Sequence, residues 1–267
     1  MSSGRTLTLA LTLSTLGAIA LPAQAIVRYT PGTRRYHLIS VVTRSQEQGG
    51  QSSQFKLTNE QLVSVALAAH GKDSLDFSYT MDSSAIVSDP PIELPDISRM
   101  KGTQVHGVMA ATGKVSSYTS TAQKNDPDMQ RLVEGMSQFL IVLPRDAKRG
   151  STWTDTTHGT VEQNGAHLNT TSIITSKIID DTTFDGQHAW RVRRSMALSM
   201  SGTQAGTGQS LTIDGTGTGD GIYYLSAAGV YLGSTATQNM RMKVVAKETG
   251  ETIPVTQAVT SKVELLH

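Results

Sequence analysis

The sequence lacks cysteine altogether. The chain therefore forms no disulfide bond, and it cannot be anchored to a membrane through a lipidated cysteine. Without such links its hydrophobic core must stabilise it, and the roughly 242 residues that follow the leader described below suffice for one large or two small domains. An exported chain without disulfides is typical of bacterial envelope or secreted proteins.

An excess of charge of one sign is also missing. The chain has 23 basic and 22 acidic residues, and removal of Arg5 with the leader leaves 22 of each. No basic face with interleaved aromatics is present, which excludes a nucleic-acid partner. The densest basic cluster is RVRR at 191–194. On a strand, Arg191 and Arg193 share one face, which indicates a solvated surface first and an anion or lipid-headgroup contact second.

A long apolar run occurs at the N-terminus. Arg5 precedes an apolar stretch from Leu7 to Leu21, and the stretch ends in Ala23-Gln24-Ala25. This is the pattern of a secretory signal peptide with its cleavage site. The alternative is a membrane anchor, but the run is short for a bilayer span of about 20 residues. We therefore expect cleavage after Ala25, export to the periplasm or medium, and no transmembrane span afterwards.

Motifs for catalysis and metal binding are missing as well. The seven histidines are scattered, and none forms H-x-x-x-H. Ser53 and Lys56 spell S-x-x-K, but the alternating pattern around them indicates a strand, whereas that chemistry needs a helical turn. Met-x-Met pairs could bind copper(I), yet no histidine or cysteine lies nearby in the sequence. We expect no enzyme activity, no cofactor and no metal site.

The residues that are abundant, Thr, Ser, Val and Gly, indicate a mainly β protein. Alternating segments are broken by Gly, Asn and Asp, as in antiparallel meanders. One segment, 126–140, predicts an amphipathic helix. Asp126 is a suitable N-cap, and an apolar stripe that includes Met136 and Phe139 follows it. The predicted strands lie at 35–43, 53–58, 62–69, 74–81, 171–180, 188–200, 221–226, 230–246 and 255–266.

Similar segments recur at a nearly constant spacing. Glu47–Gly50 and Glu162–Gly165 differ by 115 positions, as do Gly71 and Gly186, and Gly113 and Gly229 differ by 116. This offset predicts a tandem duplication. The alternative is that hairpins, which need glycine at their turns, produce similar segments without any duplication. The predicted organisation is a signal peptide at 1–25, a first β-meander at 26–125, the helix and a connector at 126–150, and a second β-meander at 151–267.

The stretch LTIDGTGTGDGIYYL (211–225) is the strongest candidate for a binding surface. It continues into a strand rather than a helix, so a nucleotide-binding loop is disfavoured. On a strand, Ile213, Gly215, Gly217, Gly219, Gly221 and Tyr223 share one face. Such a face fits either a curved strand against which the helix packs or a groove for an apolar ligand. The residues predicted to line that groove are Met136, Phe139, Met196, Met200, Ile213, Gly215, Gly217, Tyr223 and Met242.

Several short segments resemble those of uncharacterised exported bacterial proteins built from long antiparallel strands. They are FDGQHAWRV (184–192), LPRDAKRGSTW (143–153) and YYLSAAGVYLGST (223–235). More loosely, a curved sheet that embraces a helix resembles the periplasmic lipoprotein-carrier fold, which shelters acyl chains. This second resemblance concerns the fold alone.

These patterns together predict one or two strongly curved antiparallel sheets with the helix 126–140 packed on the concave side. The predicted function is non-catalytic binding or carriage of an apolar or amphipathic ligand such as a lipid. An envelope structural or assembly protein that binds a protein partner through a sheet edge is the second hypothesis. A secreted hydrolase ranks below both, because no nucleophile–base pair is visible.

Overall fold

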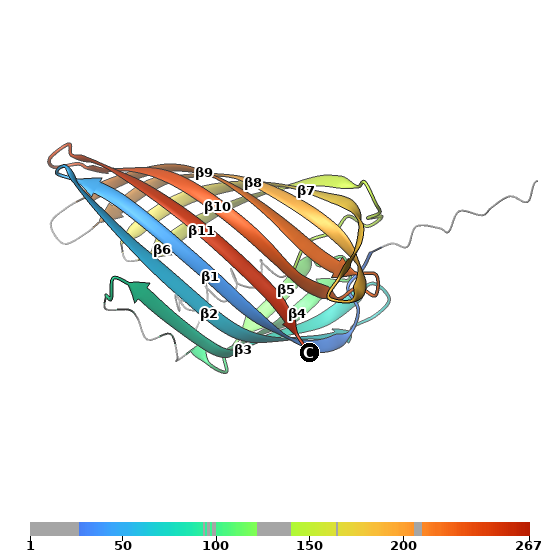
Figure 1. Ribbon diagram of the computed structural model, residues 1–267. Coiled ribbons are helices and arrows are strands. Elements are labelled where there is room, and N and C mark those ends of the chain that lie inside the picture. Colours follow the sequence, from blue (N-terminus) through green and yellow to red (C-terminus); the bar gives the residue numbers. More distant parts are fainter. Residues whose placement is uncertain are drawn as a thin grey trace, which may run out of the picture.

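The computed structural model describes residues 27–267 except 93, 95–96, 98–99, 122–139, 164 and 206–209. The described chain forms eleven strands in a single antiparallel sheet (Figure 1). They are β1 Gly32–Gln48, β2 Gln51–Ala69, β3 Ser74–Asp89, β4 Gln104–Ala110, β5 Val115–Ser120, β6 Thr152–Gln163, β7 Ala166–Phe184, β8 Gln187–Ala205, β9 Ser210–Ser226, β10 Tyr231–Ala246 and β11 Thr252–Leu266.

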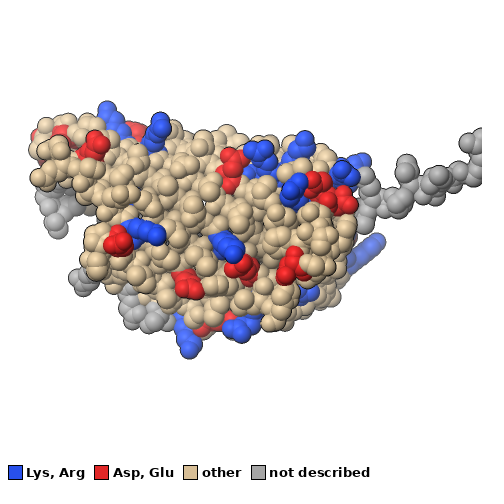
Figure 2. All heavy atoms as spheres, viewed as in Figure 1, with Lys and Arg blue, Asp and Glu red and all other residues tan. Residues whose placement is uncertain are grey.

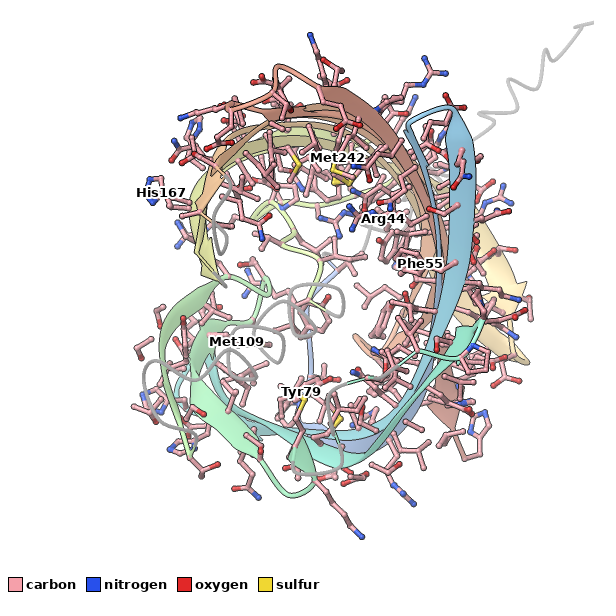
Figure 3. The ribbon with its side chains drawn as sticks, turned by 90° about the vertical axis from the view of Figure 1, so that its left-hand side faces the viewer. Arg44, Phe55, Tyr79, Met109, His167 and Met242 are labelled. Atoms are coloured by element: carbon pink, nitrogen blue, oxygen red, sulfur yellow. The ribbon has the colours of Figure 1, made fainter. Side chains whose placement is uncertain are left out.

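The first and last strands lie together at the centre of the sheet. Its strand order is β5-β4-β3-β2-β1-β11-β10-β9-β8-β7-β6. Consecutive strands pair with each other, except β5 and β6, which form the two edges. Figure 3 shows that the sheet curves strongly about an inner, concave side.

Tight turns hold the long strands in register. Gly49 and Gly50 connect β1 to β2 with φ values of 58° and 78°. Asp185 and Gly186 connect β7 to β8 with φ values of 50° and 71°. Two positive φ values in a two-residue loop are typical of the hairpin turns whose twist matches that of the flanking strands.

Two non-strand segments help to fill one end of the concave side. Residues 27–30 bond the β4–β5 turn through Tyr29 N to Ala111 O, at 2.8 Å. Residues 140–150 bond the same turn through Leu143 N to Thr112 O (2.8 Å) and bond β7 through Gly150 N to Ile178 O (2.9 Å). The side chains of Val27, Tyr29, Ile141, Leu143 and Ala147 belong to the main hydrophobic core. That core therefore occupies the end of the concave side where β1 begins.

The predicted fold class needs correction. The mainly β composition and the curved antiparallel strands are as predicted, and a single sheet forms, one of the two predicted arrangements, but the described residues contain no α-helix packed on its concave side. Most of the predicted helix, 126–139, lies outside the described residues. Its last residue, Leu140, is not helical, and next to it the main chain of Ile141 bonds the Tyr29 hydroxyl instead of continuing a helical ladder. Tertiary contacts thus override the apolar periodicity at this position.

The turns that suggested a duplication lie at matching hairpins. Glu47–Gly50 and Glu162–Gly165 fall at the β1–β2 and β6–β7 connections. Gly71 and Gly186 lie at the β2–β3 and β7–β8 connections, and Gly113 and Gly229 at the β4–β5 and β9–β10 connections. The duplication and the domain boundaries drawn from it stay predictions.

Candidate functional site

Alternate residues of each strand face the concave side. In Figure 3, Arg44, Phe55, Tyr79, Met109 and Met242 point inward, whereas His167 points outward. The cross-strand register extends this assignment over the sheet, because paired residues lie on the same face. We call this inward side the inner face.

An apolar surface occupies part of the inner face of β8, β9 and β10. We name it the methionine–glycine surface and define it by Met196, Met200, Gly215, Gly217, Met240 and Met242. Gly215 pairs with Met200 on one side and Met242 on the other, and Gly217 pairs with Leu198 and Met240. A Cβ atom at Gly215 would lie 2.9 Å from Cγ of Met242 and 3.0 Å from Cγ of Met200. The glycines therefore leave room for methionine side chains from both neighbouring strands.

Much of this surface is not covered by the residues of the main hydrophobic core. Met196, Leu198, Met200 and Met242 are half-buried, although they face inward. At the other end of the same strands, inward residues such as Val192 and Leu225 are completely buried. Unbranched, polarizable methionine side chains can repack against different apolar shapes. The half-buried region is therefore the part of the inner face suited to a ligand.

The structure brings most of the predicted ligand-binding residues together. Met196, Met200, Ile213, Gly215, Gly217, Tyr223 and Met242 all lie on the inner face of β8–β10. The predicted strand across 211–225 is confirmed as β9. Met136 and Phe139, also predicted to contact the ligand, lie outside the described residues. Strand parity identified this face, and whether it binds a ligand stays a prediction.

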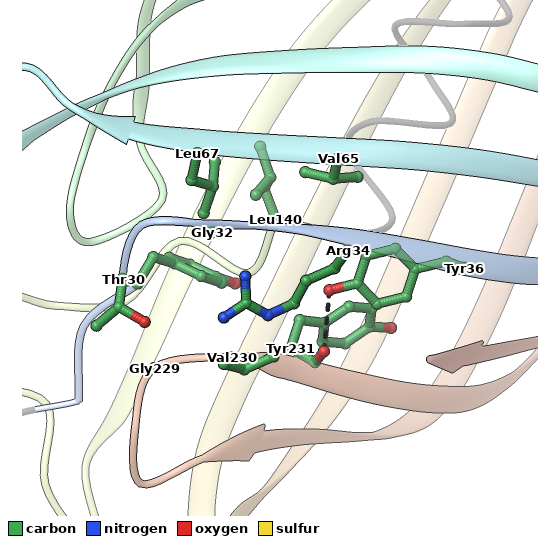
Figure 4. Close-up of a pocket in the computed structure, with 11 residues that line it drawn as sticks. Thr30, Gly32, Arg34, Tyr36, Val65, Leu67, Leu140, Gly229, Val230 and Tyr231 are labelled. Atoms are coloured by element: carbon green, nitrogen blue, oxygen red, sulfur yellow. Dashed lines mark hydrogen bonds between the residues drawn. The ribbon is translucent and has the colours of Figure 1, made fainter. Parts of the chain in front are cut away.

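A separate pocket of about 360 Å³, counting its open mouth, lies near the start of β1 (Figure 4). It is lined by the aromatic residues Tyr29, Tyr36 and Tyr231, by aliphatic residues that include Leu67, and by one charged residue, Arg34. Gly32 has a φ of +145°, which favours glycine, and a Cβ atom here would also displace the Arg34 guanidinium, which lies 1.9 Å from its position. Sequence analysis missed this pocket, because residues of four separate segments form it.

The tyrosines of the pocket are structural and neutral. Tyr29 donates to Ile141 O and accepts from Ile141 N, at 3.3 and 3.0 Å. Tyr36 donates to Tyr231 O at 3.0 Å, and Tyr231 donates to the Ser234 hydroxyl at 2.7 Å. Burial raises the pKa of Tyr29, Tyr36 and Tyr231 above the ordinary tyrosine range. These hydroxyls therefore anchor the main chain and provide no ionised phenolate at neutral pH.

The inner face is positively charged. By register it carries Arg34, Arg44 and Arg194, and among the described strand residues its acidic residues are Asp155 on β6 and Asp181 on β7. None of these arginines forms an ion pair with a described residue. The outer face differs, because Arg35 pairs with Asp82 (3.2 Å), Arg191 with Asp180 (2.5 Å) and Arg193 with Asp220 (3.3 Å). Figure 2 shows positive and negative side chains interspersed over the face of the molecule that it presents.

The described residues contain no cluster of three or more His, Cys, Asp or Glu side chains that could hold a metal ion. In that part of the chain, no helix is long and apolar enough to cross a membrane. The predicted signal peptide at 1–25 lies outside it.

No known protein family matches the chain. No curated protein matches it either. Among solved structures, it is similar to DynF from the dynemicin biosynthesis pathway of Micromonospora chersina, with 10% identity over 96% of this chain and 92% of that one and a TM-score of 0.24. It is also similar to a domain assigned as an outer membrane lipoprotein-sorting protein from Vibrio parahaemolyticus, with 11% identity over 86% and 83% of the two chains and a TM-score of 0.18. Likenesses this low establish neither a shared fold nor a shared ligand.

Proposed function

We propose that this protein binds and carries an apolar or amphipathic ligand, such as a lipid, on its concave face without catalysing a reaction. The observation that carries the proposal is the half-buried methionine–glycine surface on the inner face of β8–β10. Apolar side chains that face inward without complete burial gain free energy when a ligand covers them. The glycines bring bare backbone and flexible methionines to the same surface, which suits a long, featureless chain better than a small polar molecule.

The dimensions of the surface support a chain-like ligand. Residues 194 to 200 of β8 span about 20 Å at about 3.3 Å per residue. One leaflet of a bilayer is about 15 Å thick, half of its hydrocarbon core of about 30 Å. A single extended acyl chain therefore fits along this part of β8.

Binding of a fluorescent long-chain fatty-acid probe tests the proposal, together with native mass spectrometry of protein purified from its own compartment. We expect co-purifying lipid and saturable probe uptake. Replacing two inner-face residues, Met196→Gln with Met200→Gln, should weaken probe binding about tenfold. That loss equals about 1.4 kcal/mol, or about 60 Å² of apolar contact at about 25 cal/mol per Å².

The chain offers a matched control on the same strand. Ala197 and Ser199 alternate with the two methionines and are exposed on the outer face. The variant with Ala197→Gln and Ser199→Gln should bind the probe as the unmodified protein does. Ligand-free native protein that takes up no probe would refute the proposal.

One observation favours the second candidate, a protein partner bound at a sheet edge. β6 is a 12-residue edge strand that contains neither proline nor lysine, the usual protections of such edges. No described strand pairs with its free side. An extended peptide could add there as a further strand. Co-purification of one defined envelope protein, lost when proline replaces Thr156, would support this candidate over the lipid carrier.

A further inference from the structure

Three buried hydrogen-bond donors lie side by side at one end of the methionine–glycine surface. Trp153 of β6 pairs with Ser176 of β7, and Ser176 pairs with Arg194 of β8. Adjacent strands are about 4.8 Å apart, so the three residues form one row about 10 Å long on the inner face.

None of the three donor atoms has a hydrogen-bond partner among the described residues. The atoms are Nε1 of Trp153, Oγ of Ser176 and Nε of Arg194, and all three are inaccessible to solvent. Ser176 is only 1% exposed. Buried donors without acceptors are rare in folded proteins, because each loses its bonds to water and gains nothing in return. Three in one row indicate that an acceptor binds there.

The charge of Arg194 narrows the chemistry of that acceptor. Its neighbours on the strand, Arg191 and Arg193, pair with Asp180 and Asp220 on the outer face. Arg194 has no such partner, and its guanidinium lies 5.1 Å from the ring centre of Tyr223. The nearest inner-face acid along β6 is Asp155, whose register places it in the next row with Ile174, and no ion pair joins it to Arg194. A cation that is unpaired and held on an aromatic ring favours an anion.

The row also lies at the correct place for the head of an amphipathic molecule. Arg194 pairs with Gly221, and the next inward residues along the two strands are Met196 and Gly219. The donors therefore stand where the apolar surface begins. They lie at the start of the stretch of β8 from residue 194 to 200, about 20 Å long, that fits one acyl chain.

We propose that Trp153, Ser176 and Arg194 bind the carboxylate of a long-chain fatty acid whose chain lies on the methionine–glycine surface. This inference rests on the proposed carrier function and adds the class of ligand and its orientation. The planar guanidinium and the two neutral donors match the oxygens of a carboxylate, which accepts several hydrogen bonds at once.

The test compares a long-chain fatty acid with the fatty alcohol of the same chain length, by calorimetric titration of the full protein. Arg194→Gln should weaken binding of the acid about 10- to 100-fold, the usual effect of a hydrogen bond to a charged group. Binding of the alcohol should be unchanged. The matched control is Arg193→Gln, one residue away on the outer face, which should change neither affinity.

Two further measurements keep the test decisive if Arg194→Gln fails to fold. Ser176→Ala removes one donor with little change in volume and should weaken binding of the acid about fivefold. The chain has two tryptophans, so Trp190→Phe leaves Trp153 as the single reporter. The acid should then shift the emission of Trp153 more than the alcohol does.

The outcomes separate this inference from the function on which it rests. Equal loss of acid and alcohol binding in Arg194→Gln, or equal effects of Arg194→Gln and Arg193→Gln, would overturn the carboxylate site and leave the carrier proposal standing. Binding of neither compound by the unmodified protein would overturn both.

Discussion

At the scale of single residues, Gly229 shows how closely the main chain packs in the turns of this protein. Its φ is +78°, and a Cβ atom would lie 1.9 Å from the carbonyl oxygen of Arg28. Thr30 N also bonds Gly229 O, at 3.2 Å. Residues 28–30, which help to fill the end of the concave side, therefore pack directly against the turn between β9 and β10.

Gly229→Ala should destabilise the fold much more than Gly250→Ala. Gly250 also has a positive φ, +71°, but nothing lies within 4 Å of its Cβ position. Gly250→Ala should therefore cost only the left-handed backbone penalty of about 1–2 kcal/mol. Gly229→Ala should cost a further 1–3 kcal/mol, because the N-terminal segment must move. Urea unfolding measures both values, and equal losses would show that the Arg28 contact is unimportant.

At the scale of elements, β9 combines two kinds of glycine on one face. The three atoms nearest to a Cβ atom at Gly215 would all belong to the side chains of Met200 and Met242. At Gly217 it would lie 2.8 Å from Cγ of Met240 and also 2.9 Å from the main-chain oxygen of Asn239. Methionine side chains can therefore move to admit a Cβ atom at Gly215. At Gly217 the main chain of the neighbouring strand leaves no such room.

We expect Gly215→Ala to stay within about 1 kcal/mol of the unmodified protein, the cost of small rotamer adjustments. Gly217→Ala should lose about 2 kcal/mol, as overpacking against fixed backbone usually does. Thermal or urea unfolding of the two variants gives the comparison. A Gly215→Ala variant as unstable as Gly217→Ala would mean that Met200 and Met242 cannot move, which would argue against an adaptable surface.

At the scale of the whole molecule, the pairing of β1 with β11 connects the two halves of the sheet. The ladder runs from Arg35–Leu266 to Gln46–Val255, so the N-terminal and C-terminal strands support each other at the centre. The edges are β5 and β6, each with one described neighbour. Stability should therefore decrease from the centre of the sheet towards its edges.

Amide hydrogen exchange should show this gradient directly. Amides of β1, β10 and β11 should exchange slowest, and those of β6 that face away from β7 should exchange fastest, because no described strand bonds them. Protection of these β6 amides equal to that of β1 would contradict the prediction. It would also indicate that a partner covers the edge.

The sequence by itself determined most of the strands and the face of β9, because side-chain alternation has a period of two and is set by neighbouring residues. It divided β2 into 53–58 and 62–69, and the predicted strands do not include β4, β5 and β6. The same local rule predicted one shared face of the sheet for a set of residues that the structure places on the inner face: Met196, Met200, Gly215, Gly217 and Met242. It could not predict that residues 140–143 form neither helix nor strand, since their bonds to Tyr29 and Thr112 come from distant segments.

Only the tertiary structure decided which side of each strand is concave and which residues lie side by side across strands. Trp153, Ser176 and Arg194 are far apart in sequence, and no local pattern connects the three. They form one row because two long antiparallel pairings fix their registers. Long-range pairing of this kind depends on the packing of the complete sheet, which no single segment encodes.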